Sequence, residues 1–533
     1  MFLIGCAYHG CMKCFKPDTF NTLLQSTTIG LFKKHSIRID IIKNSIINNK
    51  KVNLVEIWEH EWDELCKEGE VKEFIINNEI KEPLSPRDAF FGGRTEAIKL
   101  YHEVKGDERI KYYDYTSLYP YVQKYCEYPV GHPEIFTENF KDLSNYFGFV
   151  KCKIIPPKKL YIPVLPSRIN GKLLFALCAI CAENKIDNCR HTDDERCLDG
   201  TWCTLEINEA LKQGYKIKKI YEIWHFSKTT KYNHETKSGG LFTSYINMFL
   251  QGKQQSSDYP KNVVTDAEKD QYIQDYYEKE GIMLDKSKIK RNEGMRTICK
   301  LLLNSHWGRF GMNTNKSQYK LIRDPSEWYD LISNDQYIVQ SADFTHKNFL
   351  QVYYINTKSL YESNSNVNVA IAAFVTAHAR LKLYSEISKL NERILYMDTD
   401  SIIFISLPNA YEPRLGDHLG QLTNEVDPKD GNYIAKYVSA GPKNYSMTYD
   451  TGKSKALVKG FALNNTTANI INFESIARIV TENQHEKIQI EQLLFKRKKN
   501  EWTNSTSIIT KSYGFVYDKR ILLENFETLP YGY

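Results

Sequence analysis

The sequence predicts an α+β protein, and three observations support this prediction. Two apolar, β-prone runs between Arg393 and Ser406 flank an Asp-Thr-Asp turn, which indicates a β-hairpin. A second strand pattern covers Arg109 to Tyr113 and stops at Asp114. Helical patterns cover residues 296–308 and 368–390. We find no internal repeat and no low-complexity tract.

The composition is that of a large globular protein. Of the 533 residues, 42% are hydrophobic and 26% are charged, which excludes a disordered chain, a collagen-like repeat and a disulfide-stapled miniprotein. At a typical ~150 residues per domain, the length indicates about three or four domains. Lys and Arg number 71 against 65 Asp and Glu, so the net charge is only +6. The total charge alone therefore does not indicate a nucleic-acid binder.

No segment of the sequence resembles a targeting signal. The run from Met1 to Cys6 has no basic region and is too short for a signal peptide. No apolar stretch reaches the ~18–20 residues of a membrane helix. We therefore expect a soluble intracellular protein, in a compartment that the sequence does not identify.

The hairpin turn carries the first chemically informative pattern. Asp398 and Asp400 are two residues apart, so both can project to the same side of an extended segment. Two carboxylates held so close repel each other unless a cation neutralises them. Magnesium accepts such oxygen ligands together with substrate phosphates. The alternative is a turn in which Asp only forms hydrogen bonds with its own backbone.

A second carboxylate stands at the end of another strand. In Tyr112-Tyr-Asp114-Tyr-Thr-Ser-Leu-Tyr119-Pro120, the strand delivers Asp114 and the proline stops regular pairing. Asp114 is distant from Asp400 in the chain, so both can bind one metal only if the fold joins their strands. Two-metal phosphoryl transfer requires such a convergence. Taken alone, Asp114 would be interpreted as a strand-terminating residue.

The third pattern is a cationic helix. Arg296, Lys300 and Asn304 recur every four residues and form one polar stripe. The residues expected on the opposite, apolar side are Ile298, Leu301 and Leu302. Two cations and an amide suit a triphosphate, and Gly308 permits a close backbone approach. The alternative is a solvated basic face.

Together these patterns resemble motifs A, B and C of a family B DNA polymerase. The matching strings are Asp114-x-x-Ser-Leu-Tyr-Pro120, Lys300-x-x-x-Asn304-Ser-x-Trp-Gly308 and Asp398-Thr-Asp-Ser401. Two further strings are similar to the family's Lys-x-Tyr motif and to the Tyr-x-Gly-Gly linker motif of protein-primed members: Gly441-Pro-Lys443-Asn-Tyr445 and Phe90-Phe-Gly92-Gly93. The strings look most like polymerases of Polinton/Maverick-type elements and related viruses or linear plasmids. Trp307 and Met397 depart from the residues that many members have.

The resemblance implies a right-hand polymerase: a palm with an antiparallel sheet, helical fingers, an insertion between motifs A and B, and a thumb. The implied divisions are a Cys-containing N-terminal segment that resembles a Vsr-like endonuclease remnant (1–80), a linker (81–105), a first palm segment with motif A (106–170), a zinc-bearing insertion (171–240), fingers with motif B (241–335), a second palm segment with motif C (336–440) and a thumb (441–533). Residues 1–105 hold no exonuclease motif and are too few for that domain. We therefore expect no proofreading exonuclease in this chain.

The resemblance also implies the role of each site residue. Asp114 and Asp400 would be the main ligands of two magnesium ions, and Asp398 would assist them. Residues implied to contact the deoxynucleoside triphosphate are Arg296, Lys300, Asn304 and Tyr119, of which Tyr119 would exclude a 2′-hydroxyl. Residues implied to contact the primer or the DNA are Tyr396, Lys443, Tyr445, Gly92 and Gly93.

The implied reaction is attack of a primer 3′-hydroxyl on the α-phosphate, with release of pyrophosphate. The implied partners are primer-template DNA, deoxynucleoside triphosphates and, as in protein-primed relatives, a terminal protein. Basic residues concentrate near the motif B helix and at Lys496–Lys499, which favours contact with a phosphate backbone.

Three rival interpretations stay open. An inactive polymerase-like scaffold would have lost a carboxylate, but all three are present. A reverse transcriptase has a hairpin similar to Tyr396-Met-Asp398, although the inserted Thr399 and the Ser-Leu-Tyr-Pro string argue against it. An endonuclease built on the N-terminal cysteine segment would need an acidic site that the sequence does not complete.

Eight of the twelve cysteines lie in two clusters, which favours metal binding over disulfides in a chain without a secretory signal. The later cluster offers four ligands for a structural zinc ion, Cys178, Cys181, Cys189 and His191, with Cys197 and Cys203 in reserve. Buried or free thiols are the alternative there. The earlier cluster offers a weaker set, Cys6, His9, Cys11 and Cys14, in the segment that resembles a Vsr-like endonuclease together with Trp58 and Trp62.

Overall fold

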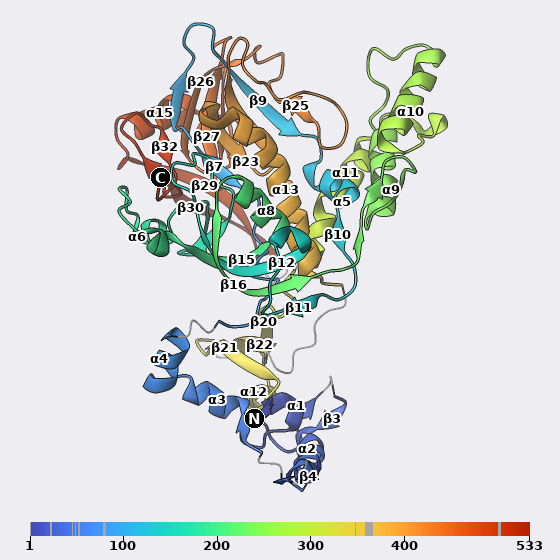
Figure 1. Ribbon diagram of the computed structural model, residues 1–533. Coiled ribbons are helices and arrows are strands. Elements are labelled where there is room, and N and C mark those ends of the chain that lie inside the picture. Colours follow the sequence, from blue (N-terminus) through green and yellow to red (C-terminus); the bar gives the residue numbers. More distant parts are fainter. Residues whose placement is uncertain are drawn as a thin grey trace. The chain divides into compact units, whose positions relative to one another are not determined.

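The computed structural model describes residues 2–21, 24–44, 46–47, 50–51, 54–77, 81–346, 348–357, 366–498 and 503–533. These residues form two compact units, the first from 1–82 and 312–367 and the second from 83–311 and 368–533 (Figure 1). This division differs from the predicted domain boundaries, because it cuts both the predicted fingers and the second palm segment. The reason is that three strands within residues 318–343 and 350–356 form a sheet of their own around a separate core.

The first unit consists of short elements and one three-stranded antiparallel sheet, in the order β20-β22-β21. Its helix α12 packs on that sheet around Ile322, Leu331 and Val352. The elements of the first unit are β1 Phe2–Ile4, α1 Cys6–His9, β2 Phe20–Asn21, β3 Ser26–Thr27, α2 Thr28–Lys43, β4 Ile46–Ile47, β5 Lys50–Lys51, β6 Glu56–Trp58, α3 Glu59–Leu65, α4 Gly69–Asn77, β20 Gln318–Ile322, α12 Pro325–Ser333, β21 Tyr337–Asp343 and β22 Leu350–Asn356.

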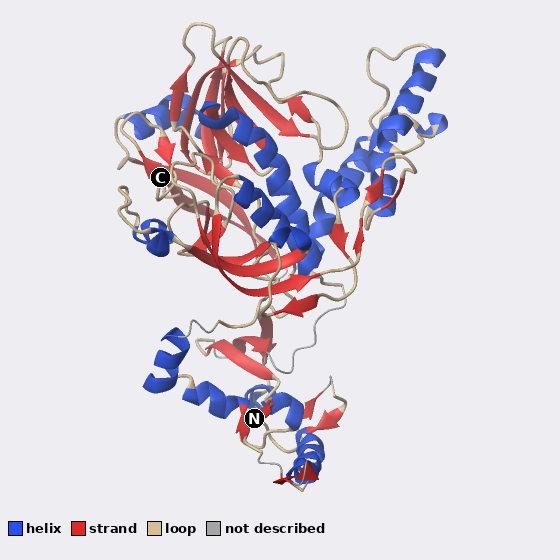
Figure 2. Ribbon diagram, viewed as in Figure 1, coloured by secondary structure: helices blue, strands red, loops and turns tan. Residues whose placement is uncertain are grey.

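A nine-stranded antiparallel sheet is the centre of the second unit (Figure 2). Its order is β28-β27-β26-β9-β24-β23-β7, with β25 paired to β9 and β8 paired to β26. The strands are β7 Thr95–Ala97, β8 Tyr101–Glu103, β9 Arg109–Tyr115, β23 Ile394–Asp398, β24 Ser401–Ser406, β25 Leu422–Asn424, β26 Ile434–Gly441, β27 Asn444–Tyr449 and β28 Ser454–Val458. The predicted hairpin and the predicted strand before Asp114 are therefore confirmed, and they are neighbours.

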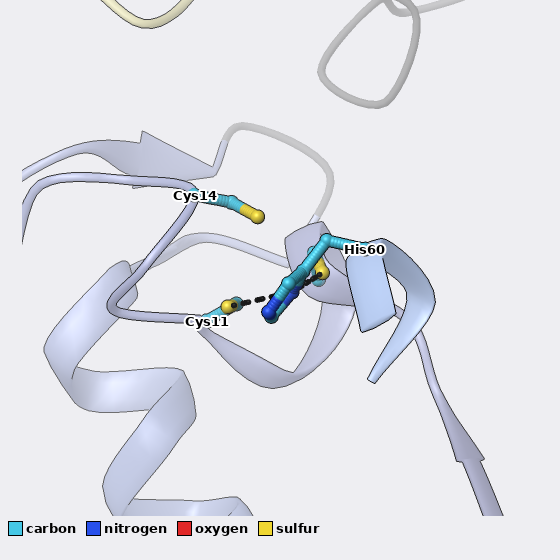
Figure 3. A group of neighbouring side chains, drawn as sticks. Cys11, Cys14 and His60 are labelled. Carbon is cyan, nitrogen blue, oxygen red and sulfur yellow. Dashed lines mark hydrogen bonds between the residues drawn. The ribbon is translucent and has the colours of Figure 1, made fainter. Parts of the chain in front are cut away.

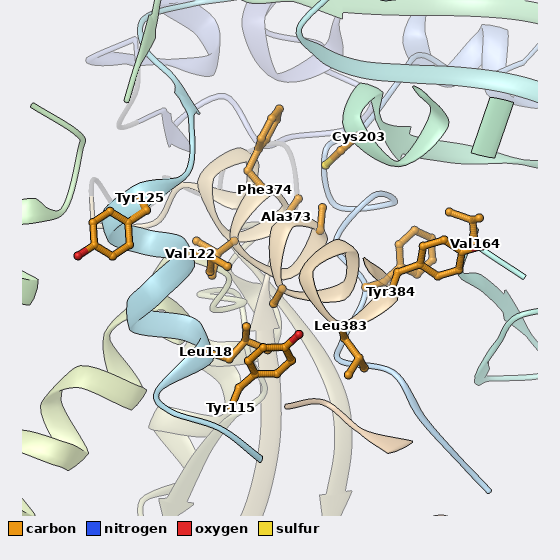
Figure 4. Packing of buried hydrophobic residues seen from close by; sticks show 14 of the residues in the cluster. Tyr115, Leu118, Val122, Tyr125, Val164, Cys203, Ala373, Phe374, Leu383 and Tyr384 are labelled. Carbon is orange, nitrogen blue, oxygen red and sulfur yellow. The ribbon is translucent and has the colours of Figure 1, made fainter. Parts of the chain in front are cut away.

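Both faces of this sheet are buried. Successive side chains of a strand point to opposite sides, so one strand contributes to the cores on both faces. On β24, Ile402 and Phe404 join one core, while Ile403 and Ile405 join the other. Helices α5 (Leu118–Tyr125) and α13 (Val369–Leu390) belong to the first core, and Figure 4 shows their side chains packed together. Helix α15 (Phe473–Thr481) packs on the opposite side, against β26 and β27. The predicted helix over residues 368–390 is confirmed.

The rest of the second unit surrounds the sheet. A four-stranded antiparallel sheet has the order β11-β16-β12-β15, and β29 and β30 form a long hairpin. The remaining elements are β10 Tyr128–Pro129, β11 Glu134–Phe136, β12 Gly148–Ile155, β13 Ser167–Ile169, β14 Lys172–Leu174, α6 Ala179–Asn184, α7 Asp193–Arg196, β15 Leu198–Cys203, α8 Thr204–Lys212, β16 Lys216–His225, β17 Thr229–Thr230, β18 Tyr232–Asn233, β19 Ser238–Gly239, α9 Thr243–Gln255, α10 Asp266–Glu280, α11 Glu293–Phe310, α14 Asn465–Ile470, β29 Lys487–Lys498, β30 Thr503–Gly514, β31 Ile521–Leu522 and β32 Thr528–Leu529. Of the predicted basic cluster, Lys496–Lys498 end β29 and Lys499 lies outside the described residues.

No helix among the described residues has the length and apolar character needed to cross a membrane.

Candidate active site

The two predicted acidic motifs meet at one edge of the central sheet. The antiparallel register of β9 and β24 places Asp114 opposite Ser401. The backbone N–H of Tyr115 donates to the carbonyl of Asp400 at 2.7 Å. Residues 399 and 400 form the tight turn between Asp398 and Ser401, which are themselves paired. Asp114, Asp398 and Asp400 are thus brought together from distant parts of the chain.

The turn that carries Asp400 is held by the linker segment. Thr399 has a φ of +53°, a left-handed conformation that is unusual for a β-branched residue. Its N–H donates to the carbonyl of Arg94 at 2.7 Å. A Cβ atom on Gly93 would lie 2.6 Å from the Thr399 hydroxyl, so a side chain at position 93 would push the linker away from the turn. Gly92 has no such neighbour, and its carbonyl accepts a hydrogen bond from Arg380 at 2.9 Å.

The carboxylates at this edge carry unbalanced negative charge. The pKa of Asp114 is raised to about 8, first by burial and then by the charges of Asp400 and Glu425, while Lys300 lowers it. The pKa of Asp400 is raised to about 6, first by burial and then by the charge of Asp398. Among the described residues, neither Asp114 nor Asp400 has an ion-pair partner. Carboxylates without an ion-pair partner, whose pKa values are raised by neighbouring carboxylates, are a donor set that fits a divalent cation.

We expect Asp114→Asn to stabilise the metal-free chain, increasingly as the pH rises. The folded pKa of Asp114 lies above its value in an unfolded chain, so ionisation destabilises the folded state as the pH rises from about 4 to about 8. The difference in free energy of unfolding should grow to about 2–4 kcal/mol at pH 8, since one pKa unit corresponds to 1.36 kcal/mol. Thermal unfolding in EDTA across that pH range checks this. Asp199→Asn, at an exposed position of β15, is the control. A pH-independent difference would contradict the prediction.

Asp398 differs from the other two carboxylates because it is already paired. The Lys443 ammonium lies 2.7 Å from its carboxylate, and the Thr95 hydroxyl donates to it at 2.7 Å. The Lys443 N–H donates to the Tyr396 hydroxyl at 2.7 Å. The rings of Tyr396 and Tyr445 have centroids 4.7 Å apart. The predicted primer-contacting residues therefore form one cluster beside the acidic turn.

Helix α11 presents the predicted cations. Asn292 caps its first turn by accepting from the Met295 N–H, and the helix packs on α9, α5 and α13. Arg296 donates to the Ser257 hydroxyl at 3.2 Å, whereas Lys300 and Asn304 are exposed. Lys300 is close enough to lower the pKa of Asp114. The helix therefore directs positive charge toward the acidic edge of the sheet.

The prediction of which residues form the apolar side of α11 is wrong in part. Ile298 and Leu301 are 54% and 64% exposed, while the buried residues are Cys299 and Leu303. Cys299 and Leu303 lie three residues after Arg296 and Lys300, so the buried face adjoins the polar stripe instead of opposing it. The helix packs along that adjoining face, which the period of the sequence alone does not identify.

Two charged residues near the site were missed by the sequence analysis. Glu425 directly follows β25, and its N–H donates to the carbonyl of Tyr112 at 2.9 Å. Lys253, on α9, donates to the Ser117 hydroxyl at 3.3 Å. Burial lowers the pKa of Lys253, and the charges of Arg296 and Lys300 lower it further, so three cations share this region. Neither residue belongs to a recognisable string.

Tyr119 stands on α5 between the acidic turn and the cationic helix. Its ring stacks on Trp307 of α11, with centroids 4.5 Å apart and planes 21° from parallel. Phe90 contacts the same indole edge-on at 6.4 Å. Burial raises the pKa of the Tyr119 hydroxyl to about 12. The ring is therefore neutral and packed in place at neutral pH.

The later cysteine cluster is assembled as predicted. The sulfur atoms of Cys178, Cys181 and Cys189 lie 3.5, 3.3 and 3.6 Å from the Nδ1 atom of His191. All four ligand atoms lie within 4.8 Å of one another. All twelve cysteines are free thiols.

The earlier cysteine cluster differs from the predicted set of ligands in one residue. Cys6, Cys11 and Cys14 gather around His60 and not around the predicted His9. His9 instead lies 3.1 Å from the Gly5 carbonyl through its Nδ1 atom. A histidine of the Trp58-Glu-His-Glu-Trp62 string was the available sequence signal, and it was overlooked.

The fold and the family match identify the class of protein. The backbone is similar to Phi29 DNA polymerase in its orthorhombic crystal form, with a TM-score of 0.51 and 14% identity over 90% of this chain and 78% of that one. The predicted right-hand polymerase fold is thereby confirmed. Residues 61–267 and 266–392 match the family described as DNA polymerase type B, organellar and viral, and the chain belongs to that family.

Curated relatives agree with this family. A probable DNA polymerase of Podospora anserina is 27% identical over 390 residues, which cover 68% of this chain and 26% of the relative. One from Neurospora intermedia is 26% identical over 401 residues, covering 73% and 34%. The chain thus spans about a quarter to a third of the length of these relatives. A particular similarity to Polinton/Maverick-type polymerases stays a prediction, as does the lack of a proofreading exonuclease.

Proposed function

We propose that this chain is a DNA-directed DNA polymerase that adds deoxynucleotides to a primer 3′-hydroxyl by two-metal phosphoryl transfer. The observation that supports this most is the pairing of β9 with β24, which brings the half-buried carboxylates of Asp114 and Asp400 together without an ion-pair partner among the described residues. Lys300 supplies positive charge nearby. Family membership supports the same reaction.

Asp114 and Asp400 would hold two magnesium ions, with Asp398 at the side. Bound magnesium supplies charge neutralisation for the attacking and the leaving oxygen atoms. The protein contributes by fixing the carboxylates on adjacent strand ends, so that little reorganisation is needed when substrate binds. Lys443 keeps Asp398 oriented through the 2.7 Å ion pair.

The substrate contacts follow from the elements around the carboxylates. Arg296, Lys300 and Lys253 would bind the triphosphate through charge-assisted hydrogen bonds, and Asn304 would border the nucleotide. Residues proposed to contact the primer terminus and the DNA are Tyr396, Lys443, Tyr445, Gly92 and Gly93. The absence of a side chain at Gly93 also lets the linker approach Thr399 closely.

We assign the polymerase subdomains to regions of the second unit. The nine-stranded sheet would be the palm, α9 to α11 the fingers, and the segment after β28 the thumb. The insertion between motifs A and B would carry a structural zinc ion on Cys178, Cys181, Cys189 and His191. The distances of 3.3–3.6 Å from sulfur to nitrogen fit a tetrahedral zinc site, for which about 3.6 Å follows from the bond lengths. The N–H of Leu177 donates to the carbonyl of Tyr531 at 2.7 Å, so this site braces the C-terminal residues.

Protein-primed replication of a mobile element, a virus or a linear plasmid is the finer proposal, and it rests on the Phe90-Phe-Gly-Gly93 string. It is tested by labelling a terminal protein with the first nucleotide. A labelled terminal protein supports protein-primed replication. A chain that extends DNA primers but leaves the terminal protein unlabelled contradicts it.

We expect Glu425→Gln to raise the magnesium concentration needed for half-maximal activity several-fold. The Glu425 charge raises the pKa of both Asp114 and Asp400, so it adds negative potential where the cations bind. A magnesium titration of primer extension measures this. Glu482→Gln, at an exposed position at the end of α15, is the matched control. An unchanged magnesium requirement would remove Glu425 from the site.

Templated primer extension tests the proposed function. The purified chain, magnesium, a labelled DNA primer and either a DNA or an RNA template are combined with deoxynucleotides. We expect extension on DNA. Efficient extension only on RNA would favour the reverse transcriptase, and DNA binding without extension would favour the inactive scaffold.

A further inference from the structure

We infer that Cys6, Cys11, Cys14 and His60 bind a structural zinc ion in the first compact unit, apart from the polymerase chemistry. Their ligand atoms all lie within 4.8 Å of one another. The Nδ1 atom of His60 lies 3.2 Å from the sulfur of Cys6 and 3.5 Å from that of Cys11. A tetrahedral zinc with ordinary Zn–S and Zn–N bonds places sulfur and nitrogen about 3.6 Å apart. Figure 3 shows Cys11, Cys14 and His60 directed toward a common point.

The backbone creates this arrangement through one pair of strands. Strand β1 pairs in parallel with β6, and Ile4 lies opposite Trp58. Cys6 and His60 each lie two residues after this pair, so both follow the same end of the two-stranded sheet. The Cys6 N–H donates to the Glu59 carboxylate at 2.9 Å, which ties the two strand ends together. Cys11 returns to the same place because its N–H donates to the Cys6 carbonyl at 2.9 Å.

The described part of this region has little hydrophobic core. Among the described residues of 2–77, none belongs to a hydrophobic core cluster. The buried apolar residues in that range are Ile4, Cys6, Ala7, Cys11, Leu31 and Ile39, and two of these are proposed ligands. A two-stranded sheet is marginal by itself, and small segments with little core commonly depend on a metal. A zinc ion would cross-link α1, the loop after it and α3.

Four protein ligands fill a tetrahedral shell, which is typical of a structural and not of a catalytic zinc ion. A disulfide would use two of the three thiols and leave the third thiol and His60 unexplained. The fourth ligand is His60 and not His9, because the group of ligand atoms within 4.8 Å of one another contains His60 and lacks His9. The His9 ring instead packs against His35, at 5.1 Å between centroids.

The reactivity of Cys14 in the wild-type chain tests this site. Cys14 is exposed and Cys66 is half-buried, so exposure alone predicts faster alkylation of Cys14. We expect the opposite in the zinc-loaded chain: Cys14 reacts with N-ethylmaleimide at least tenfold more slowly than Cys66, as measured by peptide mass spectrometry. A chelator should then raise the rate at Cys14 and leave that at Cys66 little changed. Cys14 reacting as fast as Cys66 before chelation, or a slow rate at Cys14 that the chelator leaves unchanged, would overturn the proposal.

Two variants locate the histidine ligand. His60→Ala should make Cys14 reactive without a chelator, whereas His9→Ala should leave it protected. Protection that is lost in His9→Ala and kept in His60→Ala would overturn the assignment. The wild-type comparison stands even if His60→Ala fails to fold. Because Cys14 is read separately, the result does not depend on the Cys178 cluster or on polymerase activity.

Discussion

Asp400→Ala and Asp114→Ala should each lower the rate of primer extension by about a thousandfold or more. Each substitution removes a carboxylate from a site where transition-state charge is neutralised, and a thousandfold loss corresponds to about 4 kcal/mol. Because the two residues act on the same ions, the double variant should be little worse than either single one. Single-turnover extension by one nucleotide measures these rates.

The variants should stay folded, because removing either carboxylate relieves repulsion and does not break an ion pair among the described residues. Circular dichroism and thermal unfolding check this. Asp199→Ala, on the exposed side of β15, is the matched control and should extend primers normally. Full activity in Asp400→Ala would show that the carboxylates at the sheet edge are not the metal ligands.

Tyr119→Ala should raise the use of ribonucleotides relative to deoxynucleotides by about 100-fold. The Tyr119 ring is held against Trp307 at 4.5 Å, so it cannot easily move to admit a 2′-hydroxyl. Steric exclusion of one small group is worth about 1–3 kcal/mol, which corresponds to about 10–200-fold in selectivity. The ratio of kcat/KM for matched ribonucleotide and deoxynucleotide pairs measures the effect.

Two other variants separate the steric role from a loss of packing. Tyr119→Phe keeps the ring and should keep the sugar selectivity. Tyr121→Ala removes a half-buried tyrosine of the same helix and should lower stability without changing selectivity. Unchanged sugar discrimination in Tyr119→Ala, with normal extension of deoxynucleotides, would assign the gate to another residue.

The sequence was sufficient for those features of the site that rest on local patterns. The Asp-Thr-Asp turn, the strand before Asp114 and the stripe from Arg296 to Asn304 each depend on neighbouring residues, and the structure places all three around one sheet edge. The alternation of Ile402 to Ile405 between two cores likewise follows the period of a strand buried on both faces.

Other features depend on pairing between distant segments and have no local signal. Glu425 approaches the site only because β25 pairs with β9. His60 meets the cysteines only because β1 pairs in parallel with β6. Residues 312–367 group with the first unit, in which the Lys16 N–H and the Thr19 hydroxyl both donate to the distant Asp335 carboxylate at 2.9 Å. Lys253 reaches the site through the packing of α9 on α11.

The most direct test of the proposed polymerase activity is single-nucleotide addition with the products counted. The chain, magnesium and a primer-template are mixed with each deoxynucleotide in turn, and extended primer and pyrophosphate are quantified together. We predict addition only of the nucleotide complementary to the template base, with one pyrophosphate released per nucleotide added, and loss of both products in Asp400→Ala. Addition that ignores the template, or that persists in Asp400→Ala, would contradict the proposed activity.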